Sequence, residues 1–257
     1  MSIDLIVDEA LAIITINRPE RRNAMDAAHY KALSQAWIEV RDNPGIRAAI
    51  VTGAGDKAFT AGADIKSFTA HAPPLAEVML TQQGQLLNRG LELWKPVIAA
   101  INGDCLGGGM TLMLATDIRI AARHARFGLT EVKRGLFPAN GGTQRLTQQL
   151  PHALAMELLL TGDAVGADVA ERWGLVNRVV AAEEVMPVAR DYAARICANA
   201  PLAVQAAKEL ALRSRDVDLA TGLRLEQLML RLLQTSEDVR EGSDAFSRKR
   251  PPRFTGA

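Results

Sequence analysis

Two glycine-rich segments have the residue types to bind an oxyanion through backbone N–H groups. Gly107-Gly108-Gly109 lies between a predicted strand and a run of helix formers from Met110 to Ala115, and N–H groups at the start of a helix have no intrahelical partner. The second segment, Lys57 to Lys66, follows another predicted strand. Because open α/β sheets place their sites at the carboxyl ends of strands, one donor from each segment can converge on one oxygen. Taken alone, each segment is more typical of a tight turn.

Neither segment predicts a nucleotide cofactor. A Gly-x-Gly-x-x-Gly array that began at Gly107 would need glycine where Leu112 stands, and the chain has no Gly-Lys-Ser/Thr phosphate loop. The four histidines are scattered, with no pair at metal-ligand spacing, so we predict no metal site. The two cysteines suggest no disulfide framework, and we interpret Cys105 as a buried structural thiol.

Composition and charge point to a small-molecule ligand. The 257 residues are 48% hydrophobic and 23% charged, as in an ordinary globular protein. With 30 Lys+Arg against 29 Asp+Glu, the chain lacks the basic excess of proteins that bind nucleic acid or membrane surfaces. No apolar run approaches the ~18 residues of a membrane span. We therefore expect a cytoplasmic protein with no membrane partner.

Apolar periodicity predicts an α/β core followed by helices. A hairpin is expected over Ile3–Ile16, and Asp26 can cap a helix that runs to about Val40. Three apolar runs without alternation are typical of parallel strands buried on both faces: Ala48–Thr52, Pro96–Ile101 and Asp117–Ala122. After Gly142 helical patterns dominate, apart from a short apolar run at Leu175–Val180. The expected helices are Thr143–Leu150, His152–Leu160, Ala167–Trp173, Glu183–Asn199, Leu202–Arg213, Leu219–Gln234 and Glu237–Lys249. We predict an α/β core over residues 1–195 and a helical C-terminal region over residues 196–257.

Further motifs follow the glycine segments in a specific order. They are Phe127-Gly128-Leu129-Thr130-Glu131, Gly141-Gly142-Thr143-Gln144-Arg145-Leu146, Leu160-Thr161-Gly162-Asp163 and Trp173-Gly174-Leu175-Val176, with Asn17-Arg18-Pro19 and Asn23-Ala24-Met25 before them. The set resembles the enoyl-CoA hydratase/isomerase, or crotonase, superfamily from Ile3 to Phe254. This resemblance implies a crotonase-like fold of repeated β-β-α units and a helical C-terminal region that mediates homotrimers, often stacked as homohexamers. It implies no permanently bound cofactor, since coenzyme A is part of the substrate thioester.

The resemblance also assigns site residues. The backbone N–H groups of Ala63 and Gly108 would form an oxyanion hole for the thioester carbonyl, and preorganised donors of this kind stabilise the enolate that the reaction passes through. Glu131 takes the position of the family's second catalytic glutamate, where desolvation raises a carboxyl pKa and suits it to acid/base work. The residues expected to contact coenzyme A are Ala61, Asp64, Ile65 and Lys66, Arg18 and Arg21 near its phosphates, and Phe246 and Lys249 of the same or a neighbouring subunit.

The sequence departs from the hydratase pattern at two places. Ordinary enoyl-CoA hydratases carry a first catalytic glutamate where this chain has Thr111, whose hydroxyl can orient a water but is no base near pH 7. Pro138-Ala139-Asn140 replaces the common Pro-Gly-Ala, which can reshape the acyl pocket. The pair of glutamate carboxylates that activates water in ordinary hydratases is therefore absent.

Two reactions of the superfamily can proceed with a single catalytic carboxylate. Isomerases that move a 3-enoyl double bond to C2 keep only the second glutamate, and Glu131 would then be a single proton shuttle. Hydroxycinnamoyl-CoA hydratase-lyases instead pair a Ser at the position of Thr111 with a Glu at that of Glu131. Because the stretches around Ala63, Phe127 and Gly142 are most similar to the hydratase branch, we favour hydration of a 2-enoyl-CoA. Glu131 would be its acid/base and Thr111 a ligand of water or substrate.

A non-catalytic binder is a hypothesis of another class. Thr111 suggests a disabled carrier of coenzyme A thioesters, and the basic run Arg248–Arg253 suggests an RNA binder. RNA recognition normally needs aromatic residues interleaved with basic ones. Since aromatic residues make up only 4% of the chain, we expect no nucleic-acid partner.

Overall fold

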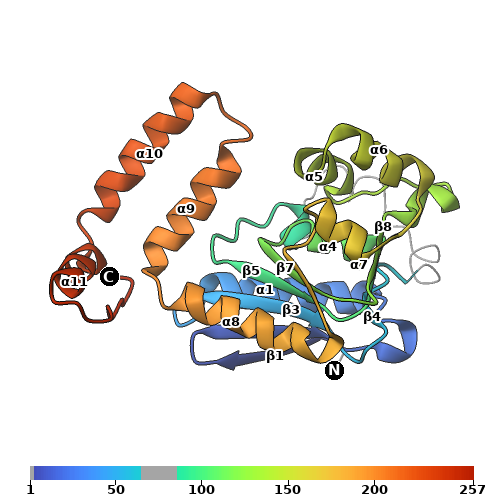
Figure 1. The fold of residues 1–257 in the computed structure, drawn as a ribbon, viewed down its shortest axis with the longest axis horizontal. Coiled ribbons are helices and arrows are strands. Elements are labelled where there is room, and N and C mark those ends of the chain that lie inside the picture. Colours follow the sequence, from blue (N-terminus) through green and yellow to red (C-terminus); the bar gives the residue numbers. More distant parts are fainter. Residues whose placement is uncertain (1–2, 65–85) are drawn as a thin grey trace.

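The larger of two sheets has six strands. The computed structural model describes residues 3–64 and 86–257, and in this sheet the strand order is β1-β2-β3-β5-β7-β10 (Figure 1). Strands β1 and β2 form the expected antiparallel hairpin, and all later neighbours are parallel. The strands are β1 (Ile3–Asp8), β2 (Leu11–Ile16), β3 (Ala48–Gly53), β5 (Val97–Ile101), β7 (Ile118–Ala122) and β10 (Arg178–Val180). Every residue of β3 and β5 is buried, which confirms the interpretation of their apolar runs.

A second, smaller sheet brings the site segments together. Its strands are β4 (Ala58–Thr60), β6 (Asp104–Leu106), β8 (Arg126–Gly128) and β9 (Val165–Gly166), in the order β4-β6-β8-β9. Each of β3, β5 and β7 is followed by a short strand of this sheet, which is the repeated β-β pattern expected of the fold. The parallel strands β4, β6 and β8 end directly before the Ala63 loop, the glycine triplet and Glu131. The sheet therefore places all three segments at one edge.

The helices largely follow the predicted ranges. Asp26 caps α1 (Ala27–Asp42) by accepting hydrogen bonds from the N–H groups of Ala28 and His29, as expected. The other α-helices are α4 (Gly108–Met113), α5 (Gly142–Gln149), α6 (His152–Thr161), α7 (Ala167–Arg172), α8 (Val185–Cys197), α9 (Pro201–Arg213), α10 (Leu219–Leu233) and α11 (Glu237–Ser247). Short 3-10 turns are η1 (Pro19–Arg21), η2 (Leu87–Arg89), η3 (Thr130–Arg134) and η4 (Ala182–Glu184).

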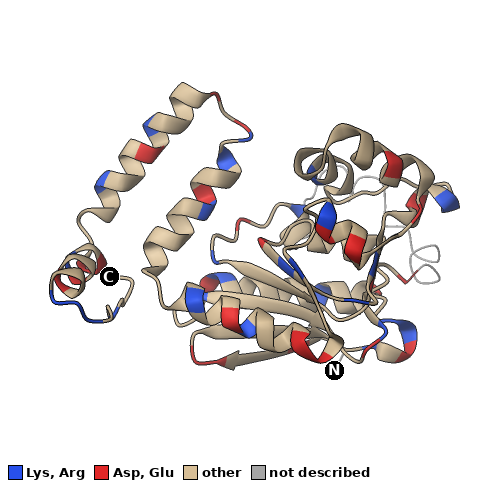
Figure 2. Cartoon of the chain, viewed as in Figure 1, with Lys and Arg blue, Asp and Glu red and all other residues tan. Residues whose placement is uncertain are grey.

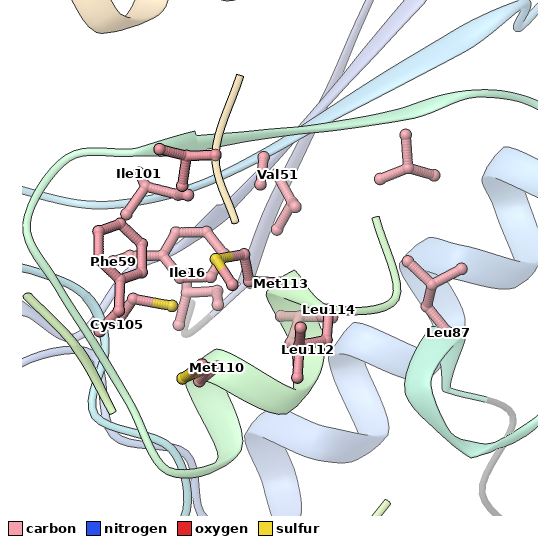
Figure 3. Close-up of a cluster of buried hydrophobic side chains, with 14 of the residues drawn as sticks. Ile16, Val51, Phe59, Leu87, Ile101, Cys105, Met110, Leu112, Met113 and Leu114 are labelled. Carbon is pink, nitrogen blue, oxygen red and sulfur yellow. The ribbon is translucent and has the colours of Figure 1, made fainter. Parts of the chain in front are cut away.

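Both faces of the larger sheet are covered by apolar packing. Helix α8 packs on one face through Ala189 and Ala193. On the other face, Phe59, Ile101, Cys105 and Met110 lie close together between the two sheets and α4 (Figure 3). Cys105 is a free, fully buried thiol whose pKa is raised by burial, which confirms that it is structural.

Arg119 fixes the end of α4, the helix that begins in the glycine triplet. Its guanidinium lies between α4 and the segment before β10, and desolvation lowers its pKa to about 10. The group donates hydrogen bonds to the Gln149 side chain and to the carbonyls of Met113, Leu114, Thr116 and Leu175. The carbonyls left unpaired at the helix end are thereby satisfied, and the C-terminus of α4 is held in place.

Helices α9, α10 and α11 extend away from the two sheets (Figure 1). Helix α10 lies beside α9 and has no buried residue. Several of its leucines are at least half exposed, with Leu219 at 78% and Leu232 at 67%. Charges of both signs are interspersed over the described elements, and α10 itself carries both (Figure 2). Among the described residues, no helix has the length and hydropathy needed to cross a membrane.

Candidate active site

Two adjacent backbone donors are free at the edge of the small sheet. In the loop after β4, the N–H groups of Ala61, Gly62 and Asp64 donate to Arg22 O, Thr60 Oγ1 and Met25 O. The N–H groups of Ala63 and Gly108 have no acceptor in the described part of the chain. The two loops are in contact, because a Cβ built on Gly62 would lie 2.4 Å from Gly108 N and one built on Gly108 would lie 3.4 Å from Ala63 N. Such a pair of donors can bind one oxyanion.

This contact requires glycine. Gly62 and Gly107 have φ values of +84° and +54°, which L side chains rarely adopt. A Cβ on Gly109 would lie 2.2 Å from the Thr60 carbonyl oxygen. The glycines therefore allow the two loops to approach closely enough for their N–H groups to face one ligand.

Glu131 places a carboxyl group beside these donors. It stands on η3 directly after β8, and its Oε1 lies 3.5 Å from the position of a Cβ on Gly107. Its Oε2 is buried and has no hydrogen-bond partner among the described residues. Burial raises the pKa of Glu131, while its own N–H group and Arg134 act in the opposite direction. A carboxyl group in this state is suited to exchange protons with a bound ligand.

The raised pKa of Glu131 makes the stability of the folded protein depend on pH. Because the folded protein holds the Glu131 proton more tightly than the unfolded chain, this carboxyl costs stability as the pH rises above its ordinary pKa of 4.5. We expect Glu131→Gln to be more stable than the wild type at neutral pH, with the difference vanishing below about pH 4. Calorimetric unfolding of both proteins across this pH range measures it. A wild type that is equally or more stable at neutral pH would contradict the burial of an ionised carboxylate.

Thr111 is part of the same site but is already hydrogen-bonded. The residue is 1% exposed, and its hydroxyl donates to Gly108 O at 3.0 Å and accepts from Asn88 Nδ2 at 3.2 Å. The hydroxyl hydrogen is thus donated to the carbonyl of Gly108, whose own N–H group is one of the two candidate oxyanion donors. One lone pair of the Thr111 hydroxyl oxygen is left for a ligand. Asn88 is buried and was missed by the sequence analysis, because nothing in its local sequence indicates that η2 packs on α4.

Removing the Thr111 hydroxyl tests its structural contribution. We expect Thr111→Val to lose about 1–3 kcal/mol of stability, because Asn88 Nδ2 is left buried without an acceptor. Activity is expected to fall about 10-fold, since the Gly108 turn loses its side-chain anchor. Thermal unfolding and turnover are the measurements, and Thr111→Ser is the control that restores the hydroxyl. If the Val and Ser variants behave alike, the hydroxyl does not matter.

The residues expected to contact coenzyme A are only partly brought together. Arg18 Nη1 lies 3.1 Å from Asp64 Oδ2 and also donates to Ala24 O, so this pair stands directly behind the Ala63 loop. Arg21 is exposed on η1, and Ala61 precedes the donors in the same loop as Asp64. Ile65 and Lys66 lie outside the described residues.

Phe246 and Lys249 are distant from this edge within one chain. Phe246 lies in the last turn of α11 and Lys249 just after that helix, on the far side of the helical region from β8 (Figure 1). Phe246 is 87% exposed. Two arginines of the adjacent basic run form ion pairs with acidic residues of α11. Arg248 pairs with Asp244, and Arg250 pairs with Glu241 and Asp244. Much of the positive charge that suggested RNA binding is therefore neutralised within α11.

Tyr30 is a site residue that the sequence motifs did not indicate. It lies on the inner face of α1, three residues before the fully buried Leu33, a spacing that indicates only a core position. The structure places its hydroxyl oxygen 3.3 Å from the position of a Cβ on Gly108. A tyrosine at the end of an apolar helix face is a weak signal, because its hydroxyl needs a polar environment.

Comparison with known proteins identifies the family. The family model described as "Enoyl-CoA hydratase/isomerase" matches residues 7–257. The chain belongs to the enoyl-CoA hydratase/isomerase family. It is 42% identical to the (E)-benzylidenesuccinyl-CoA hydratase of Thauera aromatica over all of both chains. It is 40% identical to the crotonyl-CoA hydratase of Syntrophomonas wolfei, over 96% of this chain and 95% of that one.

The solved structures agree with this assignment. An enoyl-CoA hydratase from Mycobacterium marinum superposes with a TM-score of 0.93 at 39% identity, over 100% of this chain and 99% of that chain. An enoyl-CoA hydratase from Mycobacterium tuberculosis also gives a TM-score of 0.93, at 38% identity and the same coverage. The crotonase-like fold expected from the sequence motifs is confirmed.

Proposed function

We propose that this protein catalyses the reversible hydration of a 2-enoyl-CoA thioester. The observation that carries the proposal is the buried Oε2 atom of Glu131, which lies beside the N–H groups of Ala63 and Gly108; none of the three has a hydrogen-bond partner among residues 3–64 and 86–257. Relatives at about 40% identity that are named as enoyl-CoA and related acyl-CoA hydratases support the same chemistry.

In the proposed reaction, each of these groups has one step. The thioester carbonyl accepts hydrogen bonds from Ala63 and Gly108, which makes C3 of the enoyl group electrophilic and stabilises the enolate that forms. The Glu131 carboxylate takes a proton from water as the water oxygen bonds to C3. The protonated Glu131 then returns a proton to C2, and the carbonyl reforms. One whole water is added, and Glu131 ends as it began.

We propose that Thr111 assists by keeping the Gly108 turn in position and by offering its remaining lone pair to water or substrate. Coenzyme A would be bound along the Ala61–Asp64 loop with Arg18, together with Arg21, Ile65 and Lys66. Phe246 and Lys249 would reach the coenzyme A of a neighbouring subunit. The exposed leucines of α10 support a homotrimer or homohexamer, because an apolar helix face of this kind is normally covered by a partner.

An isomerase is the second candidate, and the observation that favours it is Thr111. With no carboxylate at that position, Glu131 acts alone, and one carboxylate suffices to carry a proton between C2 and C4 of a 3-enoyl thioester. The same oxyanion hole would stabilise the dienolate.

Mass spectrometry in deuterated water separates the two reactions. Crotonyl-CoA and a 3-enoyl-CoA are each incubated with the protein. We expect one whole water to add to crotonyl-CoA. Deuterium uptake with double-bond migration, without addition of water, would instead establish the isomerase. Binding of either thioester with neither change would contradict both reactions and leave the carrier hypothesis.

A further inference from the structure

The Tyr30 hydroxyl lies at the oxyanion hole. Three groups surround the point where a Cβ on Gly108 would stand: Gly62 Cα at 3.2 Å, Tyr30 Oη at 3.3 Å and Ala63 N at 3.4 Å. The phenol oxygen, the Ala63 N–H and the Gly108 backbone therefore line one small volume. Gly108 and Ala63 are partly exposed, so a ligand can reach them.

This hydroxyl has no other use in the described part of the chain. Tyr30 packs against the core, but no hydrogen bond joins its oxygen to a described residue. A buried or half-buried phenol normally finds a partner for its O–H group. Burial raises the pKa of Tyr30, the Arg89 charge lowers it and the Glu131 charge raises it. The phenol is therefore neutral near pH 7 and keeps a hydrogen to donate.

Arg89 lies over the Tyr30 ring. Its guanidinium lies 5.9 Å from the centroid of the Tyr30 ring, in a cation-π arrangement. Arg89 Nε donates to Asn140 Oδ1 at 2.7 Å. Asn140 has a φ of +56°, and its carbonyl oxygen accepts from Arg145. The segment where this sequence departs from the common hydratase pattern is thus connected to the oxyanion hole through Arg89 and Tyr30.

We propose that Tyr30 is a third hydrogen-bond donor to the thioester carbonyl, and that Arg89 and Asn140 are the residues that position it. The proposal rests on the proposed enoyl-CoA chemistry of this site. A phenol is a more acidic donor than a backbone amide, so it stabilises the enolate more than it stabilises the ground-state carbonyl. Stronger activation of C3 suits a site in which a single carboxylate takes the proton from water.

The carbonyl itself reports on this interaction. Butanoyl-CoA with carbon-13 at the thioester carbonyl has no double bond to hydrate, so its infrared stretch can be measured on the intact protein. We expect a red shift on binding to the wild type and a smaller one in Tyr30→Phe. Tyr192→Phe is the matched control, because Tyr192 is the only other tyrosine in the sequence and stands on α8 against Arg195.

Kinetics supply the second readout. Tyr30→Phe is expected to lower kcat for crotonyl-CoA about 10- to 100-fold, below the loss typical of a backbone donor, with KM changed less than about threefold. Asn140→Ala is expected to lower kcat several-fold on its own and to add nothing in the Tyr30→Phe background, as a positioning residue would.

The outcomes separate this proposal from the function on which it rests. If the wild type fails to bind the thioester, or binds it with its carbonyl band unshifted, the proposed enoyl-CoA function fails. If the wild type shifts the band and hydrates, but Tyr30→Phe does both to the same extent, the Tyr30 proposal alone is overturned. Should Tyr30→Phe fold poorly, Asn140→Ala leaves the ring in place, and an unchanged band and kcat in that variant overturn the positioning relay.

Discussion

Glu131→Gln is expected to abolish hydration of crotonyl-CoA, with kcat falling about 10³-fold. The amide has nearly the shape of the carboxyl group but cannot accept a proton from water. Because position 111 is a threonine, no second carboxylate stands there to take part in the proton transfer. Binding of the substrate is expected to change little, because the N–H groups of Ala63 and Gly108 remain. Steady-state kinetics of the purified variant are the measurement.

The matched control is Glu157→Gln on the exposed side of α6. It removes the same charge from the surface and is expected to leave kcat unchanged. A Glu131→Gln protein that keeps more than about a tenth of the wild-type rate would show that another group takes the proton. Loss of kcat in both variants would point to net charge, and not to Glu131, as the cause.

Gly62→Ala is expected to disable the oxyanion hole. The added Cβ would lie 2.4 Å from Gly108 N and 2.9 Å from Gly108 Cα, both backbone atoms that no rotamer change can move. The two loops must therefore separate, and the Ala63 and Gly108 donors can no longer face one oxygen. We expect kcat to fall about 10²–10³-fold, as for loss of one donor, and stability to fall by about 1–3 kcal/mol.

Gly174→Ala is the control that separates the effect of the Gly62 clash from the effect of a positive φ. Gly174 has a φ of +74°, similar to that of Gly62, but a Cβ there would meet nothing within 4 Å. We expect this variant to lose about 1–2 kcal/mol of stability and to keep its activity. Equal activity losses in the two variants, measured by turnover beside thermal unfolding, would contradict the packing of Gly62 on Gly108 as the cause.

Much of the scaffold was predictable from local sequence. Apolar runs without alternation predicted β3, β5 and β7, because a strand buried on both faces carries mostly apolar side chains. Asp26 predicted the start of α1 because its short carboxylate can accept from the free N–H groups there. Neither inference needs information from distant parts of the chain, and the structure confirms both.

The small sheet was not predictable in this way. Strands β4, β6 and β8 have only three residues each, too few for a periodic pattern, and they form because β3, β5 and β7 deliver the chain to the same edge. The sequence motifs nevertheless indicated the Ala63 and Gly108 donors and Glu131 through the family resemblance. Their proximity in space follows from the parallel pairing of the three short strands.

Residue patterns alone predicted the family, the buried strands, the long helices and the residues that could do acid/base and oxyanion chemistry. Only the packing of separate elements brings the remaining polar groups to the site: Asn88 donates to Thr111, and the Tyr30 hydroxyl lies beside Gly108 while Arg89 lies over the Tyr30 ring. The physical reason is the range of each interaction. Periodicity and capping act within a few residues, whereas a hydrogen bond such as Asn88 to Thr111 depends on how separate elements pack.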